Sequence, residues 1–346
     1  MRPGAPPPSK RVGGAHTATQ KPDFTGLTTA RMATADAPLE LILALRGILA
    51  PGDTTVHDLA GVGVVFTARC LPPMVDDAQT YGAIAANAAM GEVYAAGGQP
   101  LLALHLASLP TDMPPEIAQA ILRGGAEQAR RAGAVVVGGH SGPSAQPTYG
   151  LAVLGRVAPE QVVHRGGARP GDRLVLTKAI GTGVITSAGR QGTASAEALA
   201  AAVTSMLASD APATEAARGA SVHGGNVVGG SGLVGSALEM AHASRTRVVL
   251  HAEVVPLLRD ALHHAGEGTF PQGTRSNEEQ FARHSEVGGA LDPLLRRVLF
   301  APETAGGLLL AVPPHAVAAL LANCAARGVA AAAIGEVRAG IGVLIE

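Results

Sequence analysis

The sequence predicts an α/β or α+β protein of two domains, and three observations support this. Its 346 residues exceed what one hydrophobic core usually supports. Each half alternates short strand-like apolar runs with longer runs at helical spacing. A glycine- and arginine-rich stretch, RGGARPGDR at 165–173, separates the two halves. We therefore expect an N-terminal domain at 31–160 and a C-terminal domain at 170–346.

The first 50 residues contain two kinds of segment. Residues 1–30 are rich in Pro, Gly, Thr and Ala and have hardly any large apolar side chains. Burying so little apolar surface does not offset the entropy of ordering the chain, so we expect a disordered tail. The run PLELILALRGILA at 38–50 has apolar residues at helical spacing and predicts the first ordered helix.

The rest of the N-terminal half alternates strands and helices. Short apolar runs predict strands at 62–70, 101–109, 135–142 and 149–157. Runs of small residues predict helices at 81–98, where two final glycines suit a C-cap, and at 114–133, which opens with proline. The run VVVGGHSG at 135–142 predicts a buried strand that enters a glycine turn.

The C-terminal half restarts the pattern. Residues 173–189 predict a strand, a glycine turn and a helix, and 193–208 predict another helix. The loop HGGNVVGGSGLVG at 223–235 leads into a helix, and RVVL at 247–250 begins a strand. The segment 266–289 is polar and contains glycines, so we expect a long loop. Two strand-forming stretches around a helix at 315–328 close the domain.

Charge and composition exclude several classes of function. The chain has 26 Lys and Arg against 27 Asp and Glu, a net charge of −1, which gives no electrostatic footprint for nucleic acid or an anionic membrane. There is no signal-peptide core and no apolar run long enough to span a bilayer. Cys70 and Cys324 lie far apart, which indicates neither a disulfide nor a zinc site. We expect a soluble, cytoplasmic protein.

Glycine turns are the main candidates for phosphate binding. In GGHSG, the backbone N–H groups of Gly139, His140 and Ser141 could meet phosphate oxygens, and a tight turn without a ligand is the alternative. Lys178 follows a strand and could also meet a phosphate, although a solvated lysine fits the same pattern. Its surroundings do not match P-loop spacing. The 223–235 loop is open to both interpretations, a phosphate cradle or a turn.

Carboxylates decide whether Mg²⁺ could be bound, because Mg²⁺ prefers oxygen ligands beside substrate phosphates. The candidates in the N-terminal half are Asp53, Asp58, Asp76, Asp77 and Glu92. Surface carboxylates and turn formers are the alternative for each of them. The pair His263 and His264 lies beside the polar loop without a partner motif.

The motifs, taken in order, resemble the selenophosphate synthetase (selenide, water dikinase) family, within the ATP-binding superfamily of aminoimidazole ribonucleotide synthetase. The likeness covers residues 38–346. It rests on these stretches: GDTTVHDL, YGAIAANAAMGEVYAAGGQPLLAL, PPEIAQAILRGGAEQARRAGAVVVGGHS, GLAVLGRV, LTKAIGTGVITSA, GGSGLVGSALEMA and PETAGGLLLAV. Their collinear order, rather than any single motif, carries the resemblance.

The resemblance implies two α/β domains, a homodimer paired through its N-terminal domains, and ATP held between the domains over Mg²⁺ ions. In that family ATP and selenide give selenophosphate, AMP and phosphate. Matched by position, Asp53 falls on a metal-binding Asp, and Gly139, His140 and Ser141 fall on the nucleotide-contacting turn.

Several positions depart from the family pattern. Where the family has a Thr-Asp pair at the end of a strand, this chain has Ala68 and Arg69. The Asp in the helix before the AxGG turn is Glu92, which could still bind a metal. Arg69 could contact a phosphate directly, because guanidinium groups suit that geometry.

Two further motifs and the N-terminal segment also differ. The family's TDVTGFG is NVVGGSG here, so its metal-binding Asp falls on Val227, one position after Asn226. The Asp that opens DPQTSGG is Ala301. The family's Cys or selenocysteine and Lys fall on Ala30 and Ala33.

Three functions follow from this pattern. The first is ATP-dependent phosphotransfer to selenide with an altered metal site. The second is a non-catalytic family member that keeps the dimer and a nucleotide site as a partner or regulator. The third is a related ATP-using enzyme with another small acceptor.

Overall fold

The structure is a computed structural model that describes residues 56–289 and 291–346. The predictions for the tail at 1–30, the helix at 38–50, Ala30, Ala33 and Asp53 lie outside the described residues. The predicted domain limits at 160 and 170 stay predictions, and we name the two halves by their sheets.

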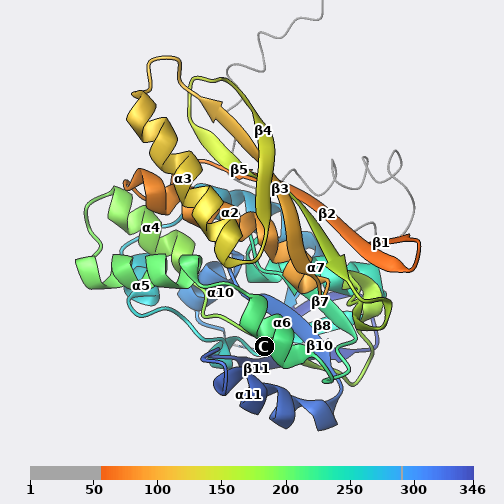
Figure 1. The fold of residues 1–346 in the computed structure, drawn as a ribbon. Helices are drawn as coiled ribbons and strands as arrows, with labels where there is room; N and C mark the ends of the chain where they lie inside the picture. Colours follow the sequence, from red (N-terminus) through yellow and green to blue (C-terminus); the bar gives the residue numbers. More distant parts are fainter. Residues whose placement is uncertain (1–55, 290) are drawn as a thin grey trace, which may run out of the picture. The chain divides into compact units, whose positions relative to one another are not determined.

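The N-terminal sheet has five strands, with two helices against one face (Figure 1). The elements are β1 (Val56–Leu59), β2 (Val62–Leu71), α2 (Ala78–Ala95), β3 (Gln99–Leu109), α3 (Pro115–Arg131), β4 (Val135–Pro143) and β5 (Thr148–Val157). The strand order is β1-β2-β5-β3-β4, and β3 and β4 are the parallel pair. The strands and helices predicted between residues 56 and 157 are all present.

Glycines allow α2 and α3 to pack closely. A Cβ on Gly82 of α2 would overlap the carbonyl oxygen of Ile121, and a Cβ on Gly124 of α3 would overlap that of Gln79. Larger residues at either position would push the helices apart. The small-residue composition that predicted helix 81–98 therefore fixes how near it lies to its neighbour.

The strand at 135–142 differs from its prediction. The strand β4 continues through Gly139, His140 and Ser141 to Pro143, so the predicted turn at GGHSG is wrong. It is mostly exposed, not buried, because it is the edge strand of the sheet. Pairing with β3 extends along the whole GGHS stretch, since Gly139 lies level with His105 and His140 with Leu106.

The C-terminal sheet has seven strands in the order β7-β10-β6-β11-β8-β12-β9, and β12 runs parallel to both β8 and β9. The strands are β6 (Arg173–Leu176), β7 (Gly224–Val227), β8 (Arg247–Leu250), β9 (Ser285–Val287), β10 (Leu308–Val312), β11 (Ala332–Arg338) and β12 (Gly342–Ile345). The helices are α4 (Thr182–Arg190), α5 (Ala196–Leu207), α6 (Ala211–Ala217), α7 (Gly232–Ser244), α8 (Ala261–Gly266), α9 (Gly273–Phe281), α10 (Pro293–Phe300) and α11 (Val317–Ala325).

Short 3₁₀ turns complete the chain at Pro159–Gln161, Arg165–Gly167, Ala252–Val254, Ala282–His284 and Pro314–Ala316. The segment 266–289, expected to be a loop, contains α9 and β9, so that prediction is wrong. The helix α9 contains few apolar residues, and only four of its residues are buried, among them Phe281. Across the described residues, the helices are all too short or too polar to cross a membrane.

The buried helix α2 joins the two sheets. Its Asn87 amide donates to the carbonyls of Met206 and Ala208 at 2.8 and 2.9 Å, and Gln128 of α3 donates to that of Leu207 at 3.1 Å. These bonds satisfy the last carbonyls of α5, which have no partners within their own helix. The core around α2 also includes C-terminal residues such as Leu308, so the two sheets share one apolar cluster.

Candidate active site

Arg69, in β2, lies beside the loop that follows β7. A Cβ on Gly229 would stand 2.8 Å from Nη1 of Arg69, so a larger residue at 229 would require the guanidinium to move. The motif alignment above places a Thr of TDVTGFG at 229 and an Asp at 69. These two differences from the family pattern are therefore complementary, because Gly229 provides the space that the larger Arg69 side chain fills.

A cavity of about 70 Å³ lies between Arg69 and Arg190. Arg190 is in the last turn of α4, where its Nη2 donates to Ser187 Oγ at 3.2 Å. Thr186, Glu303 and the prolines of the neighbouring loops complete the lining. Two guanidinium groups beside one cavity provide planar donors that suit phosphate oxygens.

Glu303 also lines this cavity, but its carboxylate is used inside the protein. The side chain is buried and accepts hydrogen bonds from the backbone N–H groups of Gly181 at 2.7 Å and Thr182 at 3.0 Å. It also accepts one from Thr182 Oγ1 at 2.5 Å. These donors form the start of α4, whose first N–H groups have no partners within the helix. Burial raises the pKa of Glu303 to about 7, and the three hydrogen bonds oppose that rise.

Glu92, a predicted metal ligand, lies in a different cluster. Its Oε2 accepts a hydrogen bond from Nη2 of Arg165 at 3.0 Å. The Nε of Arg165 donates to Asn226 Oδ1 at 3.1 Å, and its Nη1 is 3.8 Å from Glu239 Oε2. Asn226 also donates to Glu239 at 3.2 Å. One guanidinium thus joins two carboxylates and an amide from α2, β7 and α7, and we call this set the Arg165 cluster.

Lys178, predicted to meet a phosphate, has three partners of its own. Its Nζ donates to the carbonyls of Ala208 at 2.7 Å and Ala305 at 3.1 Å, and lies 3.0 Å from Asp210 Oδ1. Burial raises the pKa of Asp210, and the Lys178 charge opposes this. Contact with a nucleotide would require Nζ to give up one of these partners.

The other carboxylates predicted as possible metal ligands are Asp58, Asp76 and Asp77. Asp77 is the N-cap of α2 and accepts from Thr80 N at 2.8 Å, while Asp58 accepts from Gly61 N at 2.8 Å. Asp77 therefore caps a helix, and Asp58 stabilises the turn between β1 and β2, which is the alternative that the sequence left open for it. The described residues show no contact that tests Asp76 as a metal ligand, so that role stays a prediction.

The GGHS residues are not beside Arg69 within this chain. Gly139 is level with Arg69 in the register of the sheet, but β5 and β3 lie between their strands. At about 4.8 Å per strand spacing, three spacings separate them by about 14 Å. The structure therefore does not bring Gly139, His140 and Ser141 together with Arg69.

Two of the positions that differ from the family pattern, Val227 and Ala301, are apolar and buried. Val227 is 6% exposed, and its Cγ2 would stand 2.9 Å from a Cβ on Gly91. Ala301 is fully buried. Neither side chain offers a ligand atom, so the two acids of the family pattern have no replacement at the same positions.

Comparison with known proteins covers nearly all of the described chain. The model "AIR synthase related protein, N-terminal domain" matches residues 51–157, and "AIR synthase related protein, C-terminal domain" matches 169–345. A selenide, water dikinase of Myxococcus xanthus (strain DK1622) is 39% identical over 86% of this chain and 85% of that protein. The chain belongs to the selenide, water dikinase family of AIR synthase related proteins.

A second member of the selenide, water dikinase family supports the assignment. The protein of Yersinia pseudotuberculosis serotype I (strain IP32953) is 37% identical over 82% of this chain and 81% of its own length. Among solved structures, tt0281 from Thermus thermophilus has a TM-score of 0.70 at 21% identity, covering 88% of this chain and 95% of that one. That likeness concerns the fold, which is the two-domain α/β arrangement with two mixed sheets.

Sequence reasoning missed three residues that shape the site of this selenide, water dikinase family member. Arg165 lies in the stretch that composition marked as a domain linker, so its charge was not considered. Arg190 ends a helix, where a basic residue is common for reasons of helix stability. Glu303 could have been found, since it replaces the Gln of DPQTSGG with a charged group.

Proposed function

We propose that this chain catalyses the reaction of its relatives, in which ATP, selenide and water give selenophosphate, AMP and phosphate. The observation that carries the proposal is the 39% identity to a selenide, water dikinase over 86% of the chain. A likeness of this length covers both sheets and the loops between them. The departures described above then concern how the nucleotide is held.

The polyphosphate of ATP is proposed to contact Arg69 and Arg190. Both guanidinium groups line the same cavity, and Gly229 leaves the room that Arg69 requires. A guanidinium binds two phosphate oxygens at once and stays charged at any working pH. Arginine at 69 thus supplies positive charge directly, at a position where relatives hold an Asp for metal.

The described residues do not fit a magnesium site of the kind that the resemblance implies. Glu92 is paired with Arg165, Glu303 is committed to the start of α4, and Val227 offers no oxygen. We therefore assign no step to Mg²⁺. Asp53 remains a predicted ligand outside the described residues.

The activity is tested by phosphorus NMR of the full chain with ATP, selenide and a reductant. We expect selenophosphate, AMP and phosphate in equal amounts. AMP formation that does not depend on selenide would favour another small acceptor. A complete absence of AMP would overturn the proposal.

A second candidate is a non-catalytic member that keeps a nucleotide site, and the Arg165 cluster favours it. A guanidinium between carboxylates leaves less negative charge for divalent cations than the family mechanism requires. This candidate predicts ATP binding without turnover.

Calorimetry of ATP binding separates these possibilities. Binding that does not require Mg²⁺, and that weakens at least about tenfold in Arg69→Ala, would support the arginine site, since a charge-assisted hydrogen bond is worth about 1.5–3 kcal/mol. Arg259→Ala is the matched control, because Arg259 is an exposed arginine paired with Glu197 on α5. Binding that requires Mg²⁺ and ignores Arg69 would contradict this site.

We also propose a homodimer through the N-terminal sheet. The face opposite α2 and α3 exposes large apolar side chains on three strands, with Phe66 61% exposed, and these are Phe66, Leu102, Leu104, Val135 and Val137. Neighbouring strands place Leu102 and Phe66 on the two sides of Leu154. A second copy of the chain would cover this face with an identical one, as a two-fold dimer requires.

Light scattering with size-exclusion chromatography tests the dimer. The wild-type chain is expected at twice the monomer mass, and Phe66→Glu is expected to run as a monomer. A wild-type monomer at micromolar concentration would overturn the proposal.

We also propose that Gly139, His140 and Ser141 contact a nucleotide. They lie in β4, the edge strand of the same N-terminal sheet. The variant His140→Ala tests this contact in the same calorimetry.

A further inference from the structure

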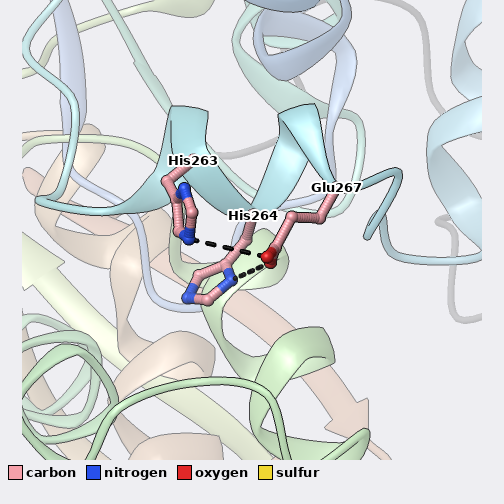
Figure 2. Close-up of side chains that lie close together, drawn as sticks. All are labelled: His263, His264 and Glu267. Atoms are coloured by element: carbon pink, nitrogen blue, oxygen red, sulfur yellow. Dashed lines mark hydrogen bonds and ion pairs between the residues drawn. The ribbon is translucent and has the colours of Figure 1, made fainter.

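Three potential metal ligands converge at the end of α8, and none of them lines the Arg69 cavity. His263 and His264 are adjacent in α8, and Glu267 is its C-cap residue. Among the described residues, these side chains form the one group of three whose ligand atoms all lie within 4.8 Å of one another. Figure 2 shows both rings directed toward the Glu267 carboxylate.

The spacing of the ligand atoms suits a small divalent cation. His263 Nε2 lies 3.6 Å from Glu267 Oε1, and His264 Nδ1 lies 3.1 Å from Glu267 Oε2. Zinc bonds to nitrogen and carboxylate oxygen of about 2.0–2.2 Å place tetrahedral ligand atoms roughly 3.3–3.5 Å apart. The two distances lie on either side of that range, so small side-chain movements would complete the geometry.

Backbone hydrogen bonds fix the main chain of this segment before any ion binds. Glu267 N donates to His263 O at 3.1 Å, and Thr269 N donates to His264 O at 3.0 Å. The His264 side chain is 5% exposed and so has little freedom, whereas His263 and Glu267 are 68% and 49% exposed. An ion could therefore enter from solvent and meet one fixed and two adjustable ligands.

We infer that His263, His264 and Glu267 bind a divalent transition-metal ion of the zinc class. Two imidazoles and one carboxylate suit Zn²⁺, Co²⁺ or Ni²⁺ better than Mg²⁺, which prefers oxygen ligands. The site uses none of the residues assigned to ATP, so it stands apart from the proposed function. Its three protein ligands leave the remaining positions to water, and its expected effect is to fix α8.

Cobalt titration of the full chain, without an affinity tag, tests the site. We expect one equivalent of Co²⁺ to give visible absorption bands of a nitrogen- and oxygen-ligated ion, and Zn²⁺ to displace them. His263→Ala and Glu267→Gln should each weaken binding at least tenfold. Both residues are exposed, so these variants are expected to fold like the wild type.

Two controls distinguish this site from others. His251→Ala removes a histidine that pairs with Glu346 at 3.6 Å but has no third ligand among the described residues, so it should leave Co²⁺ binding unchanged. Glu92→Gln should also leave it unchanged, which separates this site from the one that relatives use. Cobalt bands that persist in the His263→Ala, Glu267→Gln double variant, or their absence from the wild type, would overturn the inference.

Discussion

Glu303 lines the proposed nucleotide cavity and Glu92 belongs to the Arg165 cluster, and the partners of these two carboxylates differ. Glu303 is 3% exposed and accepts only from uncharged N–H and hydroxyl donors at the start of α4. Glu92 is partly exposed and pairs with the long side chain of Arg165. Two of the three donors of Glu303 belong to the backbone and cannot move away, whereas a guanidinium can. The first carboxylate is therefore part of the fold, and the second could be released to a cation.

The strongest test of this difference is Glu303→Ala. The variant leaves two backbone N–H groups and one hydroxyl buried without an acceptor. We expect a loss of about 3 kcal/mol or more in the free energy of unfolding, because each unsatisfied buried donor costs about 1–3 kcal/mol. Urea denaturation measures the loss. A loss below about 1 kcal/mol would show that water replaces the carboxylate and that Glu303 contributes little to the stability of the fold.

The pH dependence of stability sharpens the same point. The pKa of Glu303 is raised from 4.5 to about 7 in the folded protein, so the folded state holds this proton more tightly than the unfolded state does. Stability from this group is therefore present below about pH 4.5 and is lost as the pH rises toward 7. We expect the stability of the wild type relative to Glu303→Gln to fall by about 2 kcal/mol between about pH 5 and 7. A difference that is constant over this range would contradict the raised pKa.

The sequence predicted the strands and helices of the N-terminal half better than the site. Helix and strand runs depend on local spacing, and the small-residue run of α2 carried enough information to place it. The GGHSG end of the edge strand β4 was predicted as a turn because Gly and Ser favour turns locally, whereas pairing with β3 decides its conformation. The element α9 was missed because its apolar residues are few.

The site was harder to predict because it depends on contacts between distant segments. Arg165 meets Glu92, which lies 73 positions earlier in the sequence, and also Glu239, and no spacing rule relates the three. The motif alignment identified Arg69 as an anomaly, but the matching change at Gly229 gains meaning only from their contact. Partners of charged residues therefore had to come from the structure.

Removal of the Arg165 guanidinium tests whether Glu92 can be released. In Arg165→Met, Glu92 and Glu239 lose their shared counter-charge, and we expect a loss of about 1–2 kcal/mol, since the pair is only partly exposed. Millimolar Mg²⁺ should restore part of this loss in thermal denaturation and have no such effect on the wild type. Arg247→Met removes an arginine from the Glu286 pair and is the matched control. If Mg²⁺ fails to stabilise Arg165→Met, the carboxylates of the Arg165 cluster do not form a cation site.

The smallest effect is expected from Glu92→Gln, and it decides between two roles for the residue. The amide oxygen can still accept from Arg165, so the free energy of unfolding should fall by less than about 1 kcal/mol, as for other partly exposed ion pairs. If Arg165 has taken the place of a metal, calorimetric ATP binding should be the same in this variant with and without Mg²⁺. If Glu92 is instead the metal ligand that its sequence position predicts, ATP binding in the presence of Mg²⁺ should weaken about tenfold while stability hardly changes. The two measurements together separate a carboxylate that stabilises the fold from one that holds a cation, which neither measurement does alone.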